Sequence, residues 1–158
     1  MLLQISFLLL AEFHSSPASG TESSITAEEQ RTVEEFSVAE TLDVKLEEAL
    51  NLVSNGDYIK ALAVLSDINA TVNTIVPQNE DDEREKKIYR VKYLYVMARL
   101  QEGMGFFEKA ISYARQGIKL SRETGFEDPI PDFYRIIGVS YIQLGRFRKG
   151  KEPLRKES

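Results

Sequence analysis

Three carboxylates, Glu127, Asp128 and Asp132, are the side chains best suited to carry out chemistry in this 158-residue chain. Paired carboxylates act as general acid and general base in hydrolytic enzymes. Here they flank Pro129 and Pro131, which indicates a connection between elements, and carboxylates in such places are usually solvated or cap a helix. A carboxylate-dependent hydrolase on a helical scaffold is therefore kept only as a remote alternative.

The other residues of enzyme chemistry are scarce. The chain has no cysteine and a single histidine, His14. The lack of cysteine excludes disulfides, thiolate nucleophiles and cysteine-ligated metals. Gly103 and Gly105 come at the end of a predicted helix, whereas phosphate-binding glycine loops precede one. We expect a chain that is not an enzyme and that has no metal site, no nucleotide-binding site and no cofactor.

The charge balance argues against nucleic acid as a partner. The chain has 20 Lys and Arg against 25 Asp and Glu, a net charge of −5. A general polyanion-binding protein would carry an excess of basic residues. Six basic residues do cluster between Arg146 and Lys156, around Phe147. We interpret this cluster as a solvated or inter-repeat surface because the chain as a whole is acidic.

The first twenty residues have the pattern of a signal peptide. Residues 1–11 are almost entirely apolar, and the small residues Ala18 and Gly20 flank a suitable cleavage site. The apolar run is shorter than the roughly 20 residues of a spanning helix, so we expect no stable membrane anchor. No Lys or Arg precedes the run, which leaves a buried or frayed N-terminal helix as the alternative. A cleaved chain would be secreted or periplasmic, and an uncleaved one cytoplasmic.

Residues 21–40 form an acidic leader or capping segment. Glu, Ser and Thr dominate its composition, and large apolar residues are few. Thr26 and Glu29 have the spacing of a capping box, in which the two side chains bond to each other's backbone N–H. We expect a short helix to begin there.

From residue 41 onward the apolar residues recur at helical spacing, and no strand pattern competes. Helices are predicted over 42–53, 58–68, 88–100, 107–120 and 132–144, with a further helix beginning at Phe147. Turn residues separate them in pairs. This pattern predicts an all-α domain of antiparallel helical hairpins.

The three predicted hairpin turns share one motif. Each has a glycine, an aromatic residue two positions later and a small residue three positions further on. Glycine allows the tightly turned backbone, the aromatic ring fills the wedge between the helices, and the small residue lets their axes approach. The three motifs are Gly56-Asp-Tyr-Ile-Lys-Ala61, Gly105-Phe-Phe-Glu-Lys-Ala110 and Gly145-Arg-Phe-Arg-Lys-Gly150.

Residues 41–158 thereby resemble the tetratricopeptide repeat (TPR) family. The third unit matches the family pattern best, through Tyr134, Gly138, Tyr141, Gly145 and Phe147. The resemblance implies a right-handed solenoid of antiparallel helical hairpins, with about three divergent repeats and long connections. The third repeat is expected to be incomplete or irregular at its end, because Gly150 replaces the usual alanine and Pro153 falls within its return helix.

The TPR resemblance also implies a binding groove lined by the leading helix of each hairpin. Such grooves take extended peptides or partner helices, here a peptide with acidic or C-terminal carboxylate groups. The chaperone-type carboxylate clamp is not expected, because Leu50 and Val96 stand where it needs asparagines. Matched by position, the groove residues are Leu46, Leu50, Val53, Lys92, Tyr95, Arg99, Glu102, Arg135, Val139 and Ile142.

The sequence therefore favours a non-catalytic module that binds a protein or peptide. Its long connections resemble those of TPR arrays in bacterial regulatory and sensory proteins, so the expected role is that of an adaptor, a scaffold or a segment in signalling. The alternative is a structural spacer that self-associates through its uncapped C-terminal end.

Overall fold

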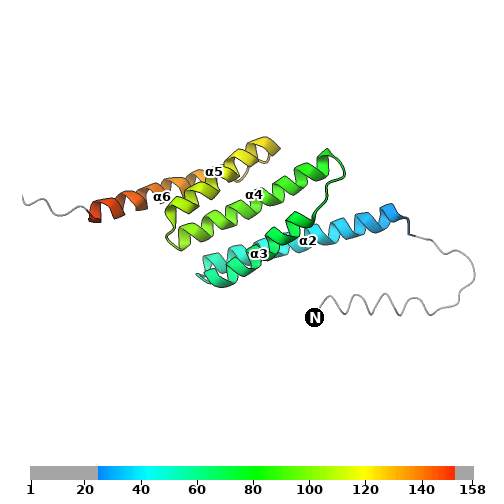
Figure 1. The fold of residues 1–158 in the computed structure, drawn as a ribbon, viewed down its shortest axis with the longest axis horizontal. Coiled ribbons are helices and arrows are strands. Elements are labelled where there is room, and N and C mark those ends of the chain that lie inside the picture. Colours follow the sequence, from blue (N-terminus) through cyan, green and yellow to red (C-terminus); the bar gives the residue numbers. More distant parts are fainter. Residues whose placement is uncertain (1–24, 152–158) are drawn as a thin grey trace, which may run out of the picture. The chain divides into compact units, whose positions relative to one another are not determined.

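The computed structural model describes residues 25–151, apart from the side chains of residues 35, 36 and 149–151. The described part contains five helices and no strand, which confirms the predicted all-α class (Figure 1). The chain divides between Glu35 and Phe36, and residues 36–151 are the part considered below unless stated otherwise. The predicted signal peptide at 1–20 and the predicted helix disruption at Pro153 lie outside the described residues. The helices are α2 (Ala27–Ser54), α3 (Tyr58–Thr74), α4 (Glu80–Gly103), α5 (Phe107–Thr124) and α6 (Ile130–Lys151).

Helix α2 begins at the predicted capping box. The Thr26 N–H donates to Glu29 Oε2 at 2.9 Å, and the Glu29 N–H donates to Thr26 Oγ1 at 3.3 Å. The helix that begins there is not short, however, because it continues through 28 residues to Ser54. Neither glycine nor proline occurs between Ala27 and Ser54, so the chain has no residue that would stop it.

The turns at Gly56 and Gly105 have the same backbone geometry, as predicted. Their φ angles are 80° and 82°, a left-handed conformation that glycine adopts without steric cost. In each turn the glycine N–H donates to the carbonyl three residues back at 3.1 Å, and the following N–H donates to the carbonyl five residues back, at 2.9 and 2.8 Å. This is the Schellman pattern, which caps the carbonyls at a helix end. The two turns join α2 to α3 and α4 to α5 as hairpins.

The third turn, predicted at Gly145, does not form, so this prediction is wrong. Helix α6 runs without interruption from Ile130 to Lys151, and Gly145 lies inside it. A glycine within a helix costs only about 1 kcal/mol relative to alanine, so it does not by itself end one. Both turns that do form are followed by a helix that packs on its partner, and within the described residues no return helix packs on α6.

Polar contacts fix where the connections meet α4. Asn79 caps the helix, its Oδ1 accepting from the Asp82 N–H at 2.9 Å. Further along, Lys86 Nζ donates to the Ile75 carbonyl at 2.7 Å and ties the helix to the chain that precedes it. Helix α5 ends at Gly125, which has φ 69° and forms its left-handed cap.

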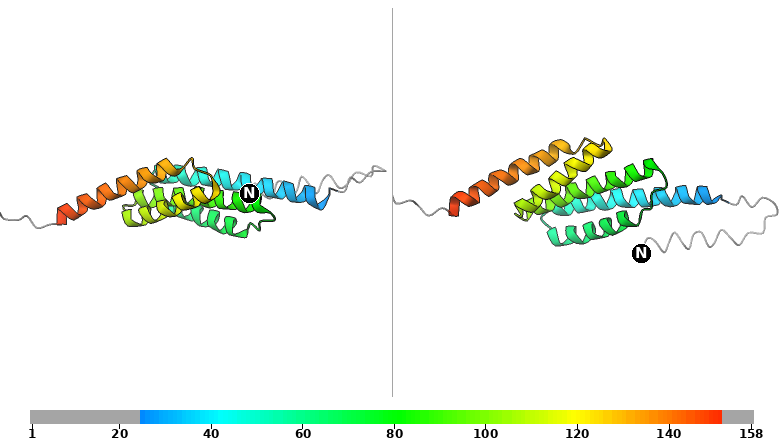
Figure 2. Two further views of the ribbon diagram at one scale, coloured as in Figure 1. Left: turned by 90° about the horizontal axis from the view of Figure 1, so that it is seen from above. Right: turned by 45° about the horizontal axis from the view of Figure 1, so that its top comes forward.

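The core consists of two apolar clusters that share α4. Figures 1 and 2 show α4 lying between α3 and α5. The first cluster joins α2, α3 and α4, and the second joins α4, α5 and α6. Because α4 presents a buried face to each side, 8 of its 24 residues are buried. Its central position makes α4 the element that holds any site between the hairpins in place.

Close approach of the helices depends on two glycines. A methyl group at Gly117 of α5 would lie 2.2 Å from Cζ of Phe133 in α6, which means that the ring packs directly on the glycine backbone. At Gly103 of α4 a methyl group would lie 2.8 Å from the hydroxyl of Tyr58, the aromatic residue of the first turn motif. Tyr58, at the start of the first hairpin's second helix, therefore contacts α4, the first helix of the next hairpin.

Candidate functional site

The leading candidate site is a groove of about 430 Å³ between α2, α4, the connection from α5 to α6 and the first turn of α6. We call it the α2–α4 groove. Six of its residues are apolar or aromatic and five are charged, so it combines an apolar floor with a polar rim. It is lined by Asp43, Leu46, Glu47, Leu50, Lys92, Tyr95, Val96, Phe126, Asp128, Pro129 and Asp132.

The floor of the α2–α4 groove is built on buried side chains of two helices. Leu46 of α2 is 7% exposed and Val96 of α4 is 3% exposed, so both belong to the core beneath the groove. Leu50, Tyr95 and Phe126 are half-buried and present apolar surface to the groove itself. A rigid apolar floor of this kind suits the side chain of a bound peptide.

A chain of polar contacts holds Tyr95 in one orientation. Its ring meets Phe133 edge to face at 5.8 Å, and its hydroxyl accepts from Arg99 Nη1 at 3.1 Å. Arg99 Nε lies 3.8 Å from one carboxylate oxygen of Glu102, and Arg135 Nη1 of α6 lies 3.5 Å from the other. The side chain of Glu102 is only 15% exposed. Both arginines therefore already have an anionic partner.

Lys92 at the rim is likewise paired. Its Nζ lies 2.8 Å from Asp43 Oδ1 and 4.9 Å from the centre of the Tyr89 ring. The Tyr89 hydroxyl donates to the Ala39 carbonyl at 3.3 Å and lies 3.4 Å from Asp43 Oδ2. Burial, followed by the nearby negative charges of Asp43 and Glu85, raises the pKa of Tyr89 to about 12. This cluster joins α2 to α4 along one side of the groove.

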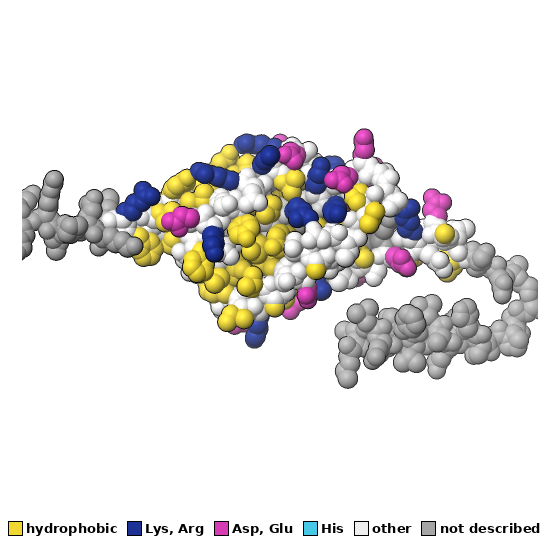
Figure 3. Space-filling model, viewed as in Figure 1, with side chains coloured by type: hydrophobic (Ala, Val, Ile, Leu, Met, Phe, Trp, Pro, Cys, Tyr) yellow, Lys and Arg dark blue, Asp and Glu magenta, His cyan; other side chains and the backbone are white. Residues whose placement is uncertain are grey.

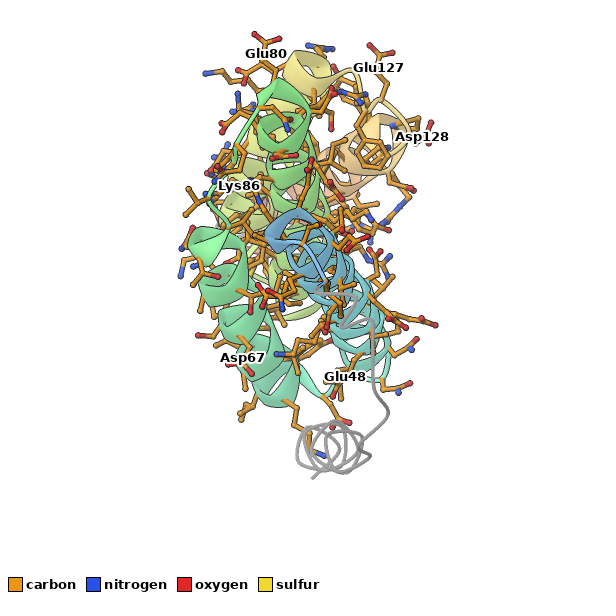
Figure 4. All side chains as sticks on the ribbon, turned by 90° about the vertical axis from the view of Figure 1, so that its right-hand side faces the viewer. Glu48, Asp67, Glu80, Lys86, Glu127 and Asp128 are labelled. Carbon is orange, nitrogen blue, oxygen red and sulfur yellow. The ribbon has the colours of Figure 1, made fainter. Side chains whose placement is uncertain are left out.

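The rim of the α2–α4 groove carries more negative than positive charge. Four carboxylates line it, and Lys92 is the one cation among its lining residues. Two of the carboxylates are exposed, Asp128 in the α5–α6 connection and Asp132 in the first turn of α6. Figure 4 shows Asp128 projecting outward from the connection between α5 and α6. The electrostatic field at the rim therefore favours a cationic ligand.

The structure brings some of the predicted groove residues together and places others elsewhere. Seven of the ten lie in the α2–α4 groove or in the polar chain beside it, namely Leu46, Leu50, Lys92, Tyr95, Arg99, Glu102 and Arg135. Val53 is 6% exposed and belongs to the core. Val139 is half-buried, Ile142 is 57% exposed, and neither is among the residues that line the groove.

The α5–α6 connection and the first turn of α6 contribute groove residues that the sequence did not predict as part of a binding groove. Phe126 and Pro129 supply apolar surface, and Asp128 and Asp132, which were considered only as remote catalytic candidates, supply charge. The sequence signal for Phe126 was an aromatic residue beside the acidic and proline residues of a connection. Periodicity could not have identified it, because the position of a connection over a neighbouring helix depends on tertiary packing.

Neither a metal site nor a membrane-spanning helix is found within residues 25–151. In this range no three His, Cys, Asp or Glu side chains converge in a way that could hold a metal ion. None of the described helices is both long enough and apolar enough to cross a bilayer. No protein-family model, curated protein or solved structure shows a significant match to this chain.

Proposed function

We propose that this chain is a TPR-like solenoid of helical hairpins that binds a protein or peptide without catalysis, as an adaptor, scaffold or sensory segment. The repeated turn motif supports this proposal. The motifs at Gly56 and Gly105 form turns with the same φ angle and the same hydrogen bonds, and each is followed by a helix that begins at the motif's aromatic residue. Two units of one design, packed through α4, are what a repeat array requires.

The α2–α4 groove is the observation that carries the proposal. It combines residues of the leading helices of two successive hairpins, which is where a repeat array of this kind presents its ligand surface. Leu46 and Leu50 come from the first hairpin, and Lys92 and Tyr95 from the second. The fixed ring of Tyr95 provides an anchor that need not be ordered when a ligand binds.

The charges of the groove point to the chemistry of the ligand. Lys92, Arg99 and Arg135 each have a carboxylate partner, and unpaired rim positions are dominated by Asp128, Asp132 and Glu47. A peptide with an apolar anchor flanked by Lys or Arg would gain both apolar burial and favourable charge contacts. We therefore favour this ligand over the acidic or carboxylate-terminated peptide that the family resemblance implies.

Binding also explains the site better than hydrolysis does. A catalytic carboxylic acid needs burial or a close second carboxylate to raise its pKa toward neutrality. Asp128 and Asp132 are both exposed on the surface of an open groove. Their contribution is then a surface charge that attracts and orients a cationic ligand.

Affinity enrichment with quantitative mass spectrometry tests the proposal. The full chain is compared with the double variant Tyr95→Ala/Asp128→Lys, which removes the anchor ring and replaces a rim carboxylate by a cation. The control is Ile59→Ala/Asp67→Lys, which makes the same two kinds of change on exposed positions of α3 outside the groove. A partner retained by the wild type and the control but lost by the groove variant supports the proposal. Identical partner lists for all three proteins would overturn it.

A further inference from the structure

A second groove, of about 590 Å³, lies between α5 and α6 and plays no part in the proposed peptide site. We call it the α5–α6 groove. Its floor is apolar, and three of its rim residues are cations from one face of α5. It is lined by Arg115, Ile118, Lys119, Arg122, Glu123, Tyr134 and Ile137.

Two arginine–tyrosine contacts fix the cations at the edge of the α5–α6 groove. Arg115 Nη2 donates to the Tyr141 hydroxyl at 2.6 Å, and Arg122 Nη2 donates to the Tyr134 hydroxyl at 2.9 Å. Arg115 and Arg122 are seven positions apart on α5, as are Tyr134 and Tyr141 on α6. The second contact therefore lies about 10.5 Å along the helices from the first. A tyrosine hydroxyl carries no charge, and both guanidinium groups keep their full positive charge. Figure 3 shows Lys and Arg side chains gathered over α5 and α6.

The same side of α6 has an uncovered apolar stripe. Tyr134 and Tyr141 are 50% and 51% exposed, and a methyl group at Gly138, between them, would meet no atom within 4 Å. In the two hairpins that form, the corresponding face of the leading helix is covered by a return helix. Because α6 continues past Gly145, this face stays open within the described residues. Its size and shape suit one further helix.

The chain contains a helix with the complementary charge. Helix α2 has eight acidic and two basic residues, whereas α5 and α6 together have nine basic and three acidic ones. Glu40, Val44 and Glu48 follow one another at four-residue intervals on α2, and all three are exposed, Val44 by 61%. The two carboxylates are about 12 Å apart along the helix, close to the 10.5 Å between Arg115 and Arg122. Val44 would then lie over Ile118 and Ile137.

We infer that the α5–α6 groove binds α2 of a second copy of this chain. Glu40 and Glu48 pair with the arginines, and Val44 packs on the apolar floor. The contact joins two different surfaces, so it is heterologous and a dimer leaves one α2 and one groove free. Association is therefore head to tail and continues beyond a dimer as concentration rises. It is also weakened by salt, because exposed charge pairs are screened.

Sedimentation velocity of the full chain tests this inference. We expect the weight-average mass to rise between about 1 and 200 μM at low salt, and to fall at about 0.5 M salt. Two charge-reversal variants are compared, Arg115→Glu/Arg122→Glu in the groove and Glu40→Arg/Glu48→Arg on α2. Each should be monomeric alone, because like charges then face each other. An equimolar mixture of the two should associate again, since each variant supplies the surface that complements the other.

A control separates this contact from a general effect of net charge. Lys60→Glu/Lys109→Glu makes the same change in net charge as the groove variant, at two exposed positions outside the α5–α6 groove, and should associate like the wild type. Circular dichroism checks that each variant is folded. A wild type that stays monomeric throughout, a control that dissociates, or a mixture that stays monomeric would each overturn the inference. Tyr95→Ala changes the proposed peptide site and none of the residues that line the α5–α6 groove, so it should leave self-association unchanged and the two proposals can fail independently.

Discussion

Replacing Gly117 by alanine should destabilise the protein, although alanine is the better helix former. A methyl group at this position would lie 2.2, 2.5 and 2.7 Å from three carbon atoms of the Phe133 ring, which is fully buried. The ring must move by about 1.2 Å or more to restore ordinary contact distances, and such overpacking costs roughly 1–3 kcal/mol. The gain in helix propensity offsets about 1 kcal/mol of this cost. We expect a net loss of up to about 2 kcal/mol in the free energy of unfolding.

Gly138→Ala provides the matched comparison for Gly117→Ala. Gly138 is also inside a helix, but a methyl group there would meet nothing within 4 Å, so this substitution should stabilise by up to about 1 kcal/mol. Urea unfolding followed by circular dichroism measures both changes. In a Phe133→Leu background the penalty at Gly117 should shrink, because the ring has been removed. Equal effects of the two alanines, or a Gly117 penalty that persists without the ring, would refute the packing of α5 against α6.

The remaining predictions concern the turns and the tyrosine beneath the groove rim. Gly56→Ala and Gly105→Ala should each lower the free energy of unfolding by about 1 kcal/mol or somewhat more, because both positions have positive φ. Gly145→Ala should instead stabilise the protein, because Gly145 lies inside a helix. A loss of stability for Gly145→Ala in urea unfolding would instead mean that the chain turns there. The pKa of Tyr89 is about 12 in the folded protein against 10 in the unfolded chain. The folded state is therefore stabilised by about 2–3 kcal/mol below pH 10 relative to pH above 12, and this stabilisation is lost as the pH rises from 10 to 12. Unfolding of Tyr89→Phe should depend less on pH in that range, and equal dependence in both proteins would contradict the assignment.

The sequence was sufficient where structure depends on neighbouring residues alone. The capping box of Thr26 and Glu29 and the glycine turns at Gly56 and Gly105 follow from the side chains and backbone of a few adjacent positions. The same motif at Gly145 did not form a turn. A hairpin turn is stabilised by the helix that packs after it, and this requirement is not contained in the motif itself.

The candidate site was predictable only in part, for a similar reason. Position within a repeated hairpin identified Leu50 and Tyr95, because residues of one helix face share one surface. It also selected Val53, which is buried, and it did not assign Phe126 to the groove. How deep a helix lies, and where a connection folds over it, depends on contacts between segments far apart in the sequence. The pairing of Arg99 and Arg135 with Glu102 is of this kind, and it changes the expected charge of the ligand.

The most direct test of the proposed function selects ligands for the α2–α4 groove without knowledge of the natural partner. Random peptides displayed on phage are selected on the full chain after counter-selection on Leu50→Asp/Tyr95→Ala, and affinities of the selected peptides are measured by fluorescence anisotropy. We predict peptides with an aromatic or aliphatic anchor next to Lys or Arg, which lose at least about tenfold in affinity on the groove variant and none on Ile59→Ala. Selected peptides that bind the groove variant as tightly as the wild type would contradict the account.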